Sequence, residues 1–338
     1  MSFLQITTLI LVLAFHLVLV TSETDDCGHD LSTPTGLDKY IDFKFLGRVF
    51  RHIVPFLSTE VKMKFYLYKR AFPSCGQELR TDDDSMERSG FNASHQTRII
   101  IHGWMSQSKN DLNRDIKDAY LSIGDFNVII VDWSVISSSL NYLKVVKLIE
   151  TFGGIVANFA NHLHSTLGVD YDDIYLIGHS LGAQIAGSAG KQVKPAQFNT
   201  IFALDPAGPA FRFKDMDCRI DMTDAKYVES IQTSVNLGLL QPVGHASFFP
   251  NKGIYQKCLG YGCSHSRAYE FFAESITSSR GFWGSLCDET ERKWSCPEEG
   301  KQYKMGGEPS QPKTGTFYVR TRATAPYALG RYHKYLYA

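Results

Sequence analysis

A pentapeptide in the middle of the chain, Gly178-His179-Ser180-Leu181-Gly182, constrains the fold more than any other feature. It directly follows an apolar run at residues 174–177 and precedes a helix-compatible stretch at residues 183–187. Gly-x-Ser-x-Gly between a strand and a helix forms a very tight turn, in which a β-carbon at either glycine would collide with the neighbouring elements. The turn lifts the serine hydroxyl clear of the sheet and points helix N–H groups toward it. A glycine-rich turn with an incidental serine is the alternative, which this context disfavours.

The remainder of the chain predicts the sheet that such a turn requires. Apolar, β-branched runs of strand length occur at residues 61–68, 98–101, 127–131, 174–177 and 200–204. Between the third and fourth runs, residues 141–163 place apolar side chains mostly at steps of three and four, which predicts an amphipathic helix. Alternating strands and helices predict an α/β fold with a mostly parallel central sheet covered by helices on both faces. In such folds the chemistry is expected where the strands end.

The charge balance excludes one large class of function. The chain of 338 residues has 35 Lys+Arg against 35 Asp+Glu, so its formal net charge is +0. Nucleic-acid binding would therefore lack its main electrostatic driving force. Charged and apolar residues are also well mixed, which argues against collagen, coiled coil and wholesale disorder.

A serine hydroxyl is a weak nucleophile, so a carboxylate and a histidine are needed to activate it, and the strand ends are where they are expected. Asp205 ends the fifth apolar run and is followed by a rigid turn at residues 206–209. Asp132 ends the third run and is the competing acid. Asp132 precedes Ser180, however, and the chain order in α/β hydrolases is serine, acid, histidine. We therefore predict Asp205 as the acid.

Two histidines downstream of the acid compete for the role of base, His245 and His265. His265 follows a short stretch between Cys258 and Cys263 that would hold the imidazole still if the two cysteines are bridged. A helix-like stretch at residues 266–276 comes next. We predict His265 as the base and His245 as a buried structural histidine.

The negative charge that develops on an attacked carbonyl oxygen requires N–H donors. One predicted donor is the backbone N–H of Leu181, directly after the serine. The second is expected after an earlier strand, where Gly103 allows close approach of the backbone to a ligand, so we predict the N–H of Trp104.

The amino-terminal residues predict secretion. Residues 6–20 are almost entirely apolar, and small side chains follow before Glu23. This pattern is typical of a cleaved secretory signal peptide over residues 1–22, and a stretch of 15 residues is short for a membrane anchor, which needs about 20. We expect one catalytic domain over residues 23–338 and an extracellular location. The sequon at Asn92 predicts N-glycosylation.

In an oxidising compartment the cysteines are disulfide candidates, and there are seven. Local pairing predicts Cys258 with Cys263 and Cys287 with Cys296. Three cysteines remain, and an odd number leaves at least one thiol free or intermolecular: Cys27, Cys75 and Cys218. The spacing of cysteines and histidines does not fit a structural zinc site.

Several short motifs together resemble the pancreatic-lipase superfamily, and the resemblance covers nearly all of the mature chain. It implies an α/β-hydrolase fold in which Ser180, Asp205 and His265 form a catalytic triad that hydrolyses carboxylic esters of lipids. The motifs that carry it lie at residues 101–104, 131–133, 178–183, 203–209, 243–245 and 263–265.

The loops indicate a branch of that superfamily. The resemblance identifies the stretch between Cys258 and Cys263 as the lid, and here it has only four residues. The other substrate-covering loop, residues 233–244, is also short. Both resemble the phospholipase A1 branch, including insect and wasp-venom members. This implies a monomeric secreted enzyme that cleaves the sn-1 acyl ester of glycerophospholipids at membrane or micelle surfaces. The alternatives are a triacylglycerol lipase or galactolipase of this fold, or a non-catalytic yolk-type storage protein.

The resemblance also bears on cofactors and on the carboxyl end. Arg219, Asp221 and Asp224 are similar to the superfamily's calcium site, but Met216 stands where that pattern has a glutamate, so we expect no metal and no cofactor. Residues 316–319 resemble the closing strand of the catalytic domain, which implies that the carboxyl-terminal lipid-binding β-sandwich is absent. Cys218 lacks the nearby partner of the venom enzymes and is expected to be the unpaired thiol.

Overall fold

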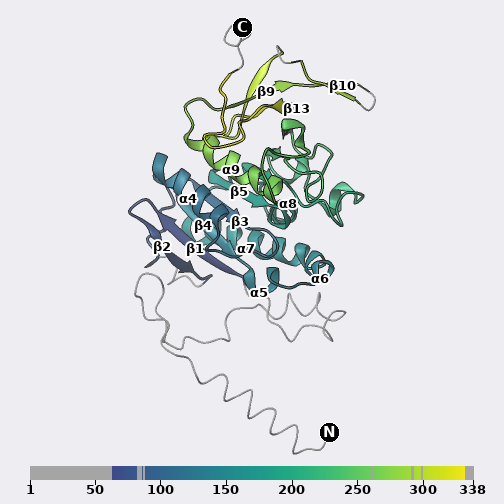
Figure 1. Ribbon diagram of the computed structural model, residues 1–338. Coiled ribbons are helices and arrows are strands. Elements are labelled where there is room, and N and C mark those ends of the chain that lie inside the picture. Colours follow the sequence, from purple (N-terminus) through teal and green to yellow (C-terminus); the bar gives the residue numbers. More distant parts are fainter. Residues whose placement is uncertain are drawn as a thin grey trace, which may run out of the picture. The chain divides into compact units, whose positions relative to one another are not determined.

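The computed structural model describes residues 63–81, 86, 88–260, 262–290, 293–297 and 300–331 (Figure 1). Apart from residues 75–77, these residues belong to one compact unit, Val61–Ser74 and Glu78–Ala338. The predicted signal peptide at residues 1–22 lies outside the described residues.

A large sheet organises the described part of the chain. Its eleven strands lie in the order β12-β9-β13-β8-β7-β6-β5-β3-β4-β1-β2. The strands from β13 to β4 in this order run parallel, whereas β1 and β9 pair antiparallel with β4 and β13. The α/β fold with a mostly parallel sheet is therefore confirmed. The bounds are β1 Lys64–Lys69, β2 Phe72–Leu79, β3 Thr97–Ile101, β4 Asn127–Asp132, β5 Ile174–His179, β6 Thr200–Leu204, β7 Tyr227–Ile231, β8 Ala246–Pro250, β9 Phe282–Leu286, β12 Gln302–Met305 and β13 Gly315–Val319, with β10 Asp288–Thr290 and β11 Lys293–Ser295 forming a separate pair.

Helices cover both faces of this sheet. Successive side chains of a strand point to opposite faces, so a strand that is apolar throughout packs against helices on both sides. Ile99 and Ile101 pack in one buried cluster with side chains of α7 and α8, whereas Ile100 packs in a second cluster with side chains of α4 and α9. Figure 1 shows α4 beside α9, and these two helices are in contact. The helices are α4 Asp111–Ile123, α5 Ser134–Ser137, α6 Tyr142–Val146, α7 Ile149–Leu167, α8 Leu181–Gln192 and α9 Cys263–Thr277, and the 3₁₀ helices are η4 Tyr171–Asp173, η5 Met216–Cys218, η6 Met222–Asp224 and η7 Asn251–Gly253.

The single helix predicted over residues 141–163 is wrong in its continuity. The structure divides it into α6 and α7, with a break at Lys147 and Leu148. The side chain of Asn141 caps α6 by accepting a hydrogen bond from the Lys144 N–H at 3.0 Å. Both helices keep apolar residues at steps of three and four, so the spacing alone does not reveal a break between them.

The close packing of α7 on α8 depends on a glycine. A β-carbon on Gly153 of α7 would lie 2.3 Å from Oγ of Ser188 in α8, closer than non-bonded atoms come. Because α8 begins directly after Ser180, the fit between the two helices fixes the position of the candidate nucleophile. The two helices therefore form a rigid support beneath the predicted site.

The carboxyl-terminal strands end at β13 in chain order, whereas their places in the sheet follow a different order. Residues 316–319 do form a strand, β13, but it lies between β8 and β9 inside the sheet. β9 and β12 then extend the sheet beyond β13. A strand's place in a sheet depends on long-range pairing, which a local pattern does not encode.

Candidate active site

The turn at Ser180 has the backbone that the motif predicts. Ser180 sits at φ 59° and ψ −122° between β5 and α8, a strained conformation for a residue with a side chain. A β-carbon on Gly178 would lie 2.4 Å from the Gly182 carbonyl oxygen, and one on Gly182 would lie 2.1 Å from the Ile101 carbonyl oxygen. Both glycines are therefore required by space, and the Ser180 side chain does not cap α8.

Asp205, the predicted acid, lies fully buried at the end of β6. Its Oδ1 accepts hydrogen bonds from the backbone N–H groups of Thr233 at 2.7 Å and Ser234 at 3.1 Å. Its Oδ2 accepts from the Ser234 hydroxyl and from Nδ1 of His265. These donors fix the plane of the carboxylate and stabilise its charge in a site without solvent contact.

The turn that carries Asp205 is joined to the turn that carries Ser180. The Ser180 N–H donates to the Leu204 carbonyl at 3.0 Å, and the Ala207 N–H donates to the Ser180 carbonyl at 3.1 Å. Parallel pairing of β5 with β6 brings both turns to the same edge of the sheet. The acid and the serine are therefore held in one rigid unit.

His265 lies in the first turn of α9, so the expectation that it precedes the helix is wrong. Cys263, the first residue of α9, is disulfide-bonded to Cys258. The Ser264 hydroxyl accepts a hydrogen bond from the Gln256 N–H at 2.9 Å. Because His265 Nδ1 faces a carboxylate oxygen, it carries the proton, which leaves Nε2 as the basic atom.

A second histidine, His179, supports His265 and was not predicted. The two rings lie 4.4 Å apart between centroids, and His179 Nε2 donates to the His265 carbonyl at 3.1 Å. Burial, with a smaller effect from a charge on His265, lowers the pKa of His179 well below 6.5. The His179 ring is therefore neutral at pH 7 and adds no charge beside His265. Its position one residue before Ser180 was the only available sequence signal.

The depressed pKa of His179 predicts a loss of stability in acid. Below pH 6.5 the unfolded chain binds a proton at this residue and the folded chain does not, so stability falls as pH falls. The loss from His179 approaches about 1.4 kcal/mol per pH unit, the effect of one proton, once the pH is below 6.5 and while the folded ring stays unprotonated. Urea unfolding at several pH values measures the slope. In His179→Gln the free energy of unfolding should depend less steeply on pH, by the amount that one proton contributes. An unchanged slope would contradict the assignment.

The two predicted N–H donors flank Ser180. The amide of Leu181 opens α8, and a β-carbon on Gly103 would lie only 2.9 Å from the Ser180 β-carbon, which places the Trp104 amide beside the serine. Neither amide donates a hydrogen bond within the described part of the chain. The Trp104 side chain is anchored separately, since Nε1 donates to the Ser139 carbonyl at 2.7 Å. Both N–H groups are therefore available to an oxyanion.

The two competing residues are engaged with other partners. Asp132 accepts hydrogen bonds from the Ser108 hydroxyl at 2.7 Å and the Ser134 N–H at 2.9 Å, and its Oδ1 lies 3.6 Å from His102 Nε2. Burial alone would raise the pKa of Asp132, but these three partners lower it well below its usual value. His245 precedes β8, at the opposite edge of the sheet from Ser180, and accepts from the Val228 N–H at 3.0 Å. Burial lowers the pKa of His245.

The carboxylates that resemble a calcium site are engaged within the protein. Asp224 pairs with the Lys191 ammonium and accepts from the Asp221 N–H at 2.9 Å. The Asp221 side chain caps η6 by accepting from Thr223. Burial raises the pKa of Asp224 to about 6, against the effect of Lys191. Within the described ranges, no group of three or more His, Cys, Asp or Glu side chains is placed to hold a metal ion.

We therefore expect chelation to leave activity unchanged. Lys191 supplies the positive charge next to Asp224 that a calcium ion would otherwise supply. Ester hydrolysis measured in excess EDTA should remain within about twofold of the rate with added calcium, a difference of about 0.4 kcal/mol. A loss of more than tenfold that calcium restores would show that a metal site exists.

The cysteines and the sequon occupy distinct places. Besides the bond at the start of α9, Cys287 is joined to Cys296. Cys75 is disulfide-bonded, Cys27 lies outside the described residues, and Cys218 is an exposed free cysteine. Asn92 is exposed in a turn before β3.

Known proteins are similar to this sequence over most of its length. The Lipase family model matches residues 48–327. Pancreatic triacylglycerol lipase of Mus musculus is 30% identical over 316 residues, which cover 82% of this chain and 68% of that protein. Pancreatic lipase-related protein 2 of Homo sapiens is 30% identical over 319 residues, covering 83% and 67%. Phospholipase A1 of Vespa velutina is 35% identical over 266 residues, covering 72% and 88%. The chain therefore belongs to the Lipase family, in the pancreatic-lipase superfamily, and is a lipase-type carboxylic ester hydrolase.

Proposed function

We propose that the chain is a phospholipase A1, which hydrolyses the sn-1 acyl ester of glycerophospholipids with Ser180 as nucleophile, His265 as base and Asp205 as the acid that orients it. The observation that carries the substrate class is the short covering loop. The disulfide between Cys258 and Cys263 closes it over four residues, directly before the helix that holds His265. Such a loop leaves the serine open to a lipid whose head group stays in water.

The second covering loop, residues 233–244, supports the same proposal. The Arg212 guanidinium donates to the carbonyls of Val235 and Asn236, and the Leu239 side chain is buried. This loop is therefore fastened to the catalytic domain. The relative named phospholipase A1 also matches this chain over 88% of its own length, more than the pancreatic relatives cited above.

The proposed chemistry uses Ser180, His265 and the two backbone amides beside the serine. The Ser180 hydroxyl gives its proton to His265 Nε2 as Oγ forms a bond to the ester carbon, and the amides of Leu181 and Trp104 stabilise the oxyanion. Cleavage of the ester bond releases lysophospholipid, whose oxygen takes the proton from His265. Water, activated by the same nitrogen, then hydrolyses the acyl-enzyme to a fatty acid. Hydrolases of the Lipase family need no cofactor for these steps.

The proposal includes secretion of a monomer as one catalytic domain over residues 23–338, after cleavage of residues 1–22, with glycan at Asn92. The disulfides support an oxidising compartment. None of the helices in the described residues has both the length and the apolar character to cross a membrane. Mass spectrometry of the secreted protein would identify the new amino terminus and the occupancy of Asn92.

Product analysis tests the substrate class. The enzyme is incubated with liposomes of phosphatidylcholine carrying distinguishable sn-1 and sn-2 chains, and separately with emulsions of triacylglycerol and galactolipid. We expect the sn-1 chain to be released first and faster than fatty acid from either emulsion. A preference for triacylglycerol or galactolipid, or release of the sn-2 chain first, would overturn the proposal in favour of another lipase. Failure to hydrolyse any ester would favour the storage protein.

A lid graft separates loop length from other causes. A long amphipathic segment inserted between Cys258 and Cys263 should raise triacylglycerol hydrolysis relative to phosphatidylcholine hydrolysis. The matched control is an insertion of the same length made of Gly and Ser. If both insertions act alike, or neither changes the ratio, loop length does not decide the substrate.

A further inference from the structure

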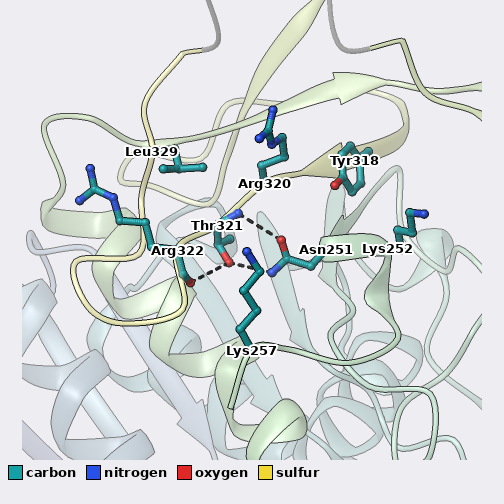
Figure 2. A pocket seen from close by; sticks show the side chains of 8 residues that line it. All are labelled: Asn251, Lys252, Lys257, Tyr318, Arg320, Thr321, Arg322 and Leu329. Atoms are coloured by element: carbon teal, nitrogen blue, oxygen red, sulfur yellow. Dashed lines mark hydrogen bonds between the residues drawn. The ribbon is translucent and has the colours of Figure 1, made fainter. Parts of the chain in front are cut away.

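A basic pocket lies at the carboxyl ends of β8 and β13 and takes no part in the proposed chemistry. It has a volume of about 550 Å³, and its rim carries Lys252, Lys257, Arg320 and Arg322 (Figure 2). Among the described residues that line it, none is acidic. Two neutral side chains form its base: Asn251 Nδ2 donates to Thr321 Oγ1 at 2.8 Å. Figure 2 shows Lys257 extending toward this pair.

Within the part of the chain that the structure describes, no carboxylate neutralises the lysines on this rim. The ion pairs of the described residues include none to Lys252 or Lys257, and both side chains are exposed. Asn251 and Lys252 also adopt φ of 50° and 74°, a left-handed backbone that is costly for residues other than glycine. The turn between β8 and the covering loop therefore has a defined backbone, from which the exposed Lys252 side chain extends. Its chemistry suits a phosphate oxygen.

Apolar side chains alternate with these lysines along the chain. Ile254 is 43% exposed, Tyr255 is 61% exposed and Leu259, in the covering loop, is 97% exposed. Exposed apolar groups beside cations fit a lipid surface, where the former enter the acyl region and the latter meet the head groups. A soluble anion alone would make no use of the apolar side chains.

The pocket is too far from Ser180 to hold the phosphate of the lipid being cleaved. β8 lies three strands from β5, and neighbouring strands are spaced about 4.8 Å apart, so the separation is roughly 14 Å. In a glycerophospholipid the phosphate and the sn-1 ester are attached to the same glycerol. The ligand must therefore come from another molecule in the same surface.

A chain of hydrogen bonds joins the base of the pocket to the catalytic acid. Asn251 Nδ2 also donates to Gln256 Oε1 at 2.8 Å, and the buried Gln256 Nε2 donates to the Thr233 carbonyl at 3.0 Å. The Thr233 N–H donates to Asp205. These hydrogen bonds connect the pocket to the active site. A ligand bound in the pocket would therefore hold the active site in a defined orientation on the surface that carries the ligand.

We propose that this pocket binds the phosphate of a neighbouring anionic phospholipid, and that the segment from Lys252 to Leu259 docks the carboxyl edge of the sheet on anionic lipid surfaces. The proposal rests on the proposed function, because it assumes a phospholipid surface as the place of action. It adds a binding site for a lipid that is not cleaved.

Vesicle co-sedimentation tests this without relying on hydrolysis. Ser180→Ala protein is mixed with vesicles of phosphatidylcholine alone or with phosphatidylglycerol. The test variant is Lys252→Gln with Lys257→Gln. The control is Arg70→Gln with Lys194→Gln, which removes the same charge from exposed residues near the opposite edge of the sheet. Each cation near an anionic surface contributes about fivefold in binding, so the test variant should bind phosphatidylglycerol vesicles about 25-fold more weakly.

The outcomes separate the possibilities. The proposal predicts a strong preference for phosphatidylglycerol vesicles, lost in high salt and in the test variant but kept in the control, and weaker vesicle binding by Leu259→Ser. Equal losses in the test and control variants would overturn it in favour of diffuse charge attraction. Calorimetry with inorganic phosphate distinguishes the source: phosphate binding with no vesicle preference would indicate a soluble ligand and overturn the docking role. None of these measurements depends on ester cleavage. Failure of the phospholipase assay and failure of vesicle binding can therefore be told apart.

Discussion

Replacement of Ser180 by alanine is expected to lower ester hydrolysis by about 10⁶-fold while the protein remains folded. The covalent route is lost with the hydroxyl, and only the oxyanion donors and substrate binding remain. The measurement is kcat/KM on a soluble short-chain ester, with the thermal midpoint recorded in parallel. Alanine fits this turn as serine does, because the strain lies in the backbone and not in the side chain.

The matched control for this substitution is Ser138→Ala. Ser138 is exposed and directly follows α5, and its hydroxyl donates to the Ser134 carbonyl at 2.7 Å. Its replacement should leave kcat/KM within about twofold, a change of about 0.4 kcal/mol. If Ser180→Ala keeps activity within about tenfold of the unsubstituted protein, another group is the nucleophile and the proposed mechanism fails.

Replacement of Asp205 by asparagine should lower kcat/KM by about 10⁴-fold. Asparagine offers an oxygen and an NH₂ group where Asp205 has two acceptors, and Oδ1 and Oδ2 both accept hydrogen bonds in the folded protein. An NH₂ group facing His265 favours the tautomer with the proton on Nε2, which cannot act as base. The imidazole of His265 would therefore remain in the site, but as the tautomer that cannot accept the proton of Ser180.

Asp132→Asn provides the contrast, because Asp132 also ends a strand at this edge of the sheet. Its partners are His102, Ser108 and Ser134, so the substitution should lower the midpoint of urea unfolding and leave kcat/KM within about tenfold. The roles would be reversed if Asp132→Asn abolished turnover in folded protein and Asp205→Asn did not.

Much of the site was predictable from local sequence. The turn at Ser180 needs glycine at positions 178 and 182, because a β-carbon at either position would collide with the backbone. Both glycines lie within five consecutive residues, so the sequence motif reveals this requirement. The apolar runs before Ser180 and Asp205 formed β5 and β6, and β6 has the predicted bounds. Local pairing likewise matched the disulfide between Cys258 and Cys263. These features depend on neighbours in the chain, so their pattern is local.

Other features depend on residues that are distant in sequence. His265 meets Asp205 across 60 residues, and the donors from Thr233 and Ser234 reach the same carboxylate from a third segment. The support of His265 by His179 was not visible, since a histidine beside the serine gives no sign of which ring it contacts.

The sequence by itself determined the α/β fold, the strained serine turn, the strand ends that carry the acid, and membership of a lipase superfamily. Only the tertiary structure decided which face each helix covers, that the helix over residues 141–163 breaks, and that Lys252 and Arg322 line one pocket. The physical reason is that a turn or a strand is limited by sterics between adjacent residues, whereas a site is assembled by sheet pairing. Pairing brings the carboxyl ends of β5, β6, β8 and β13 to one edge, and the side chains there become neighbours only when the sheet has formed.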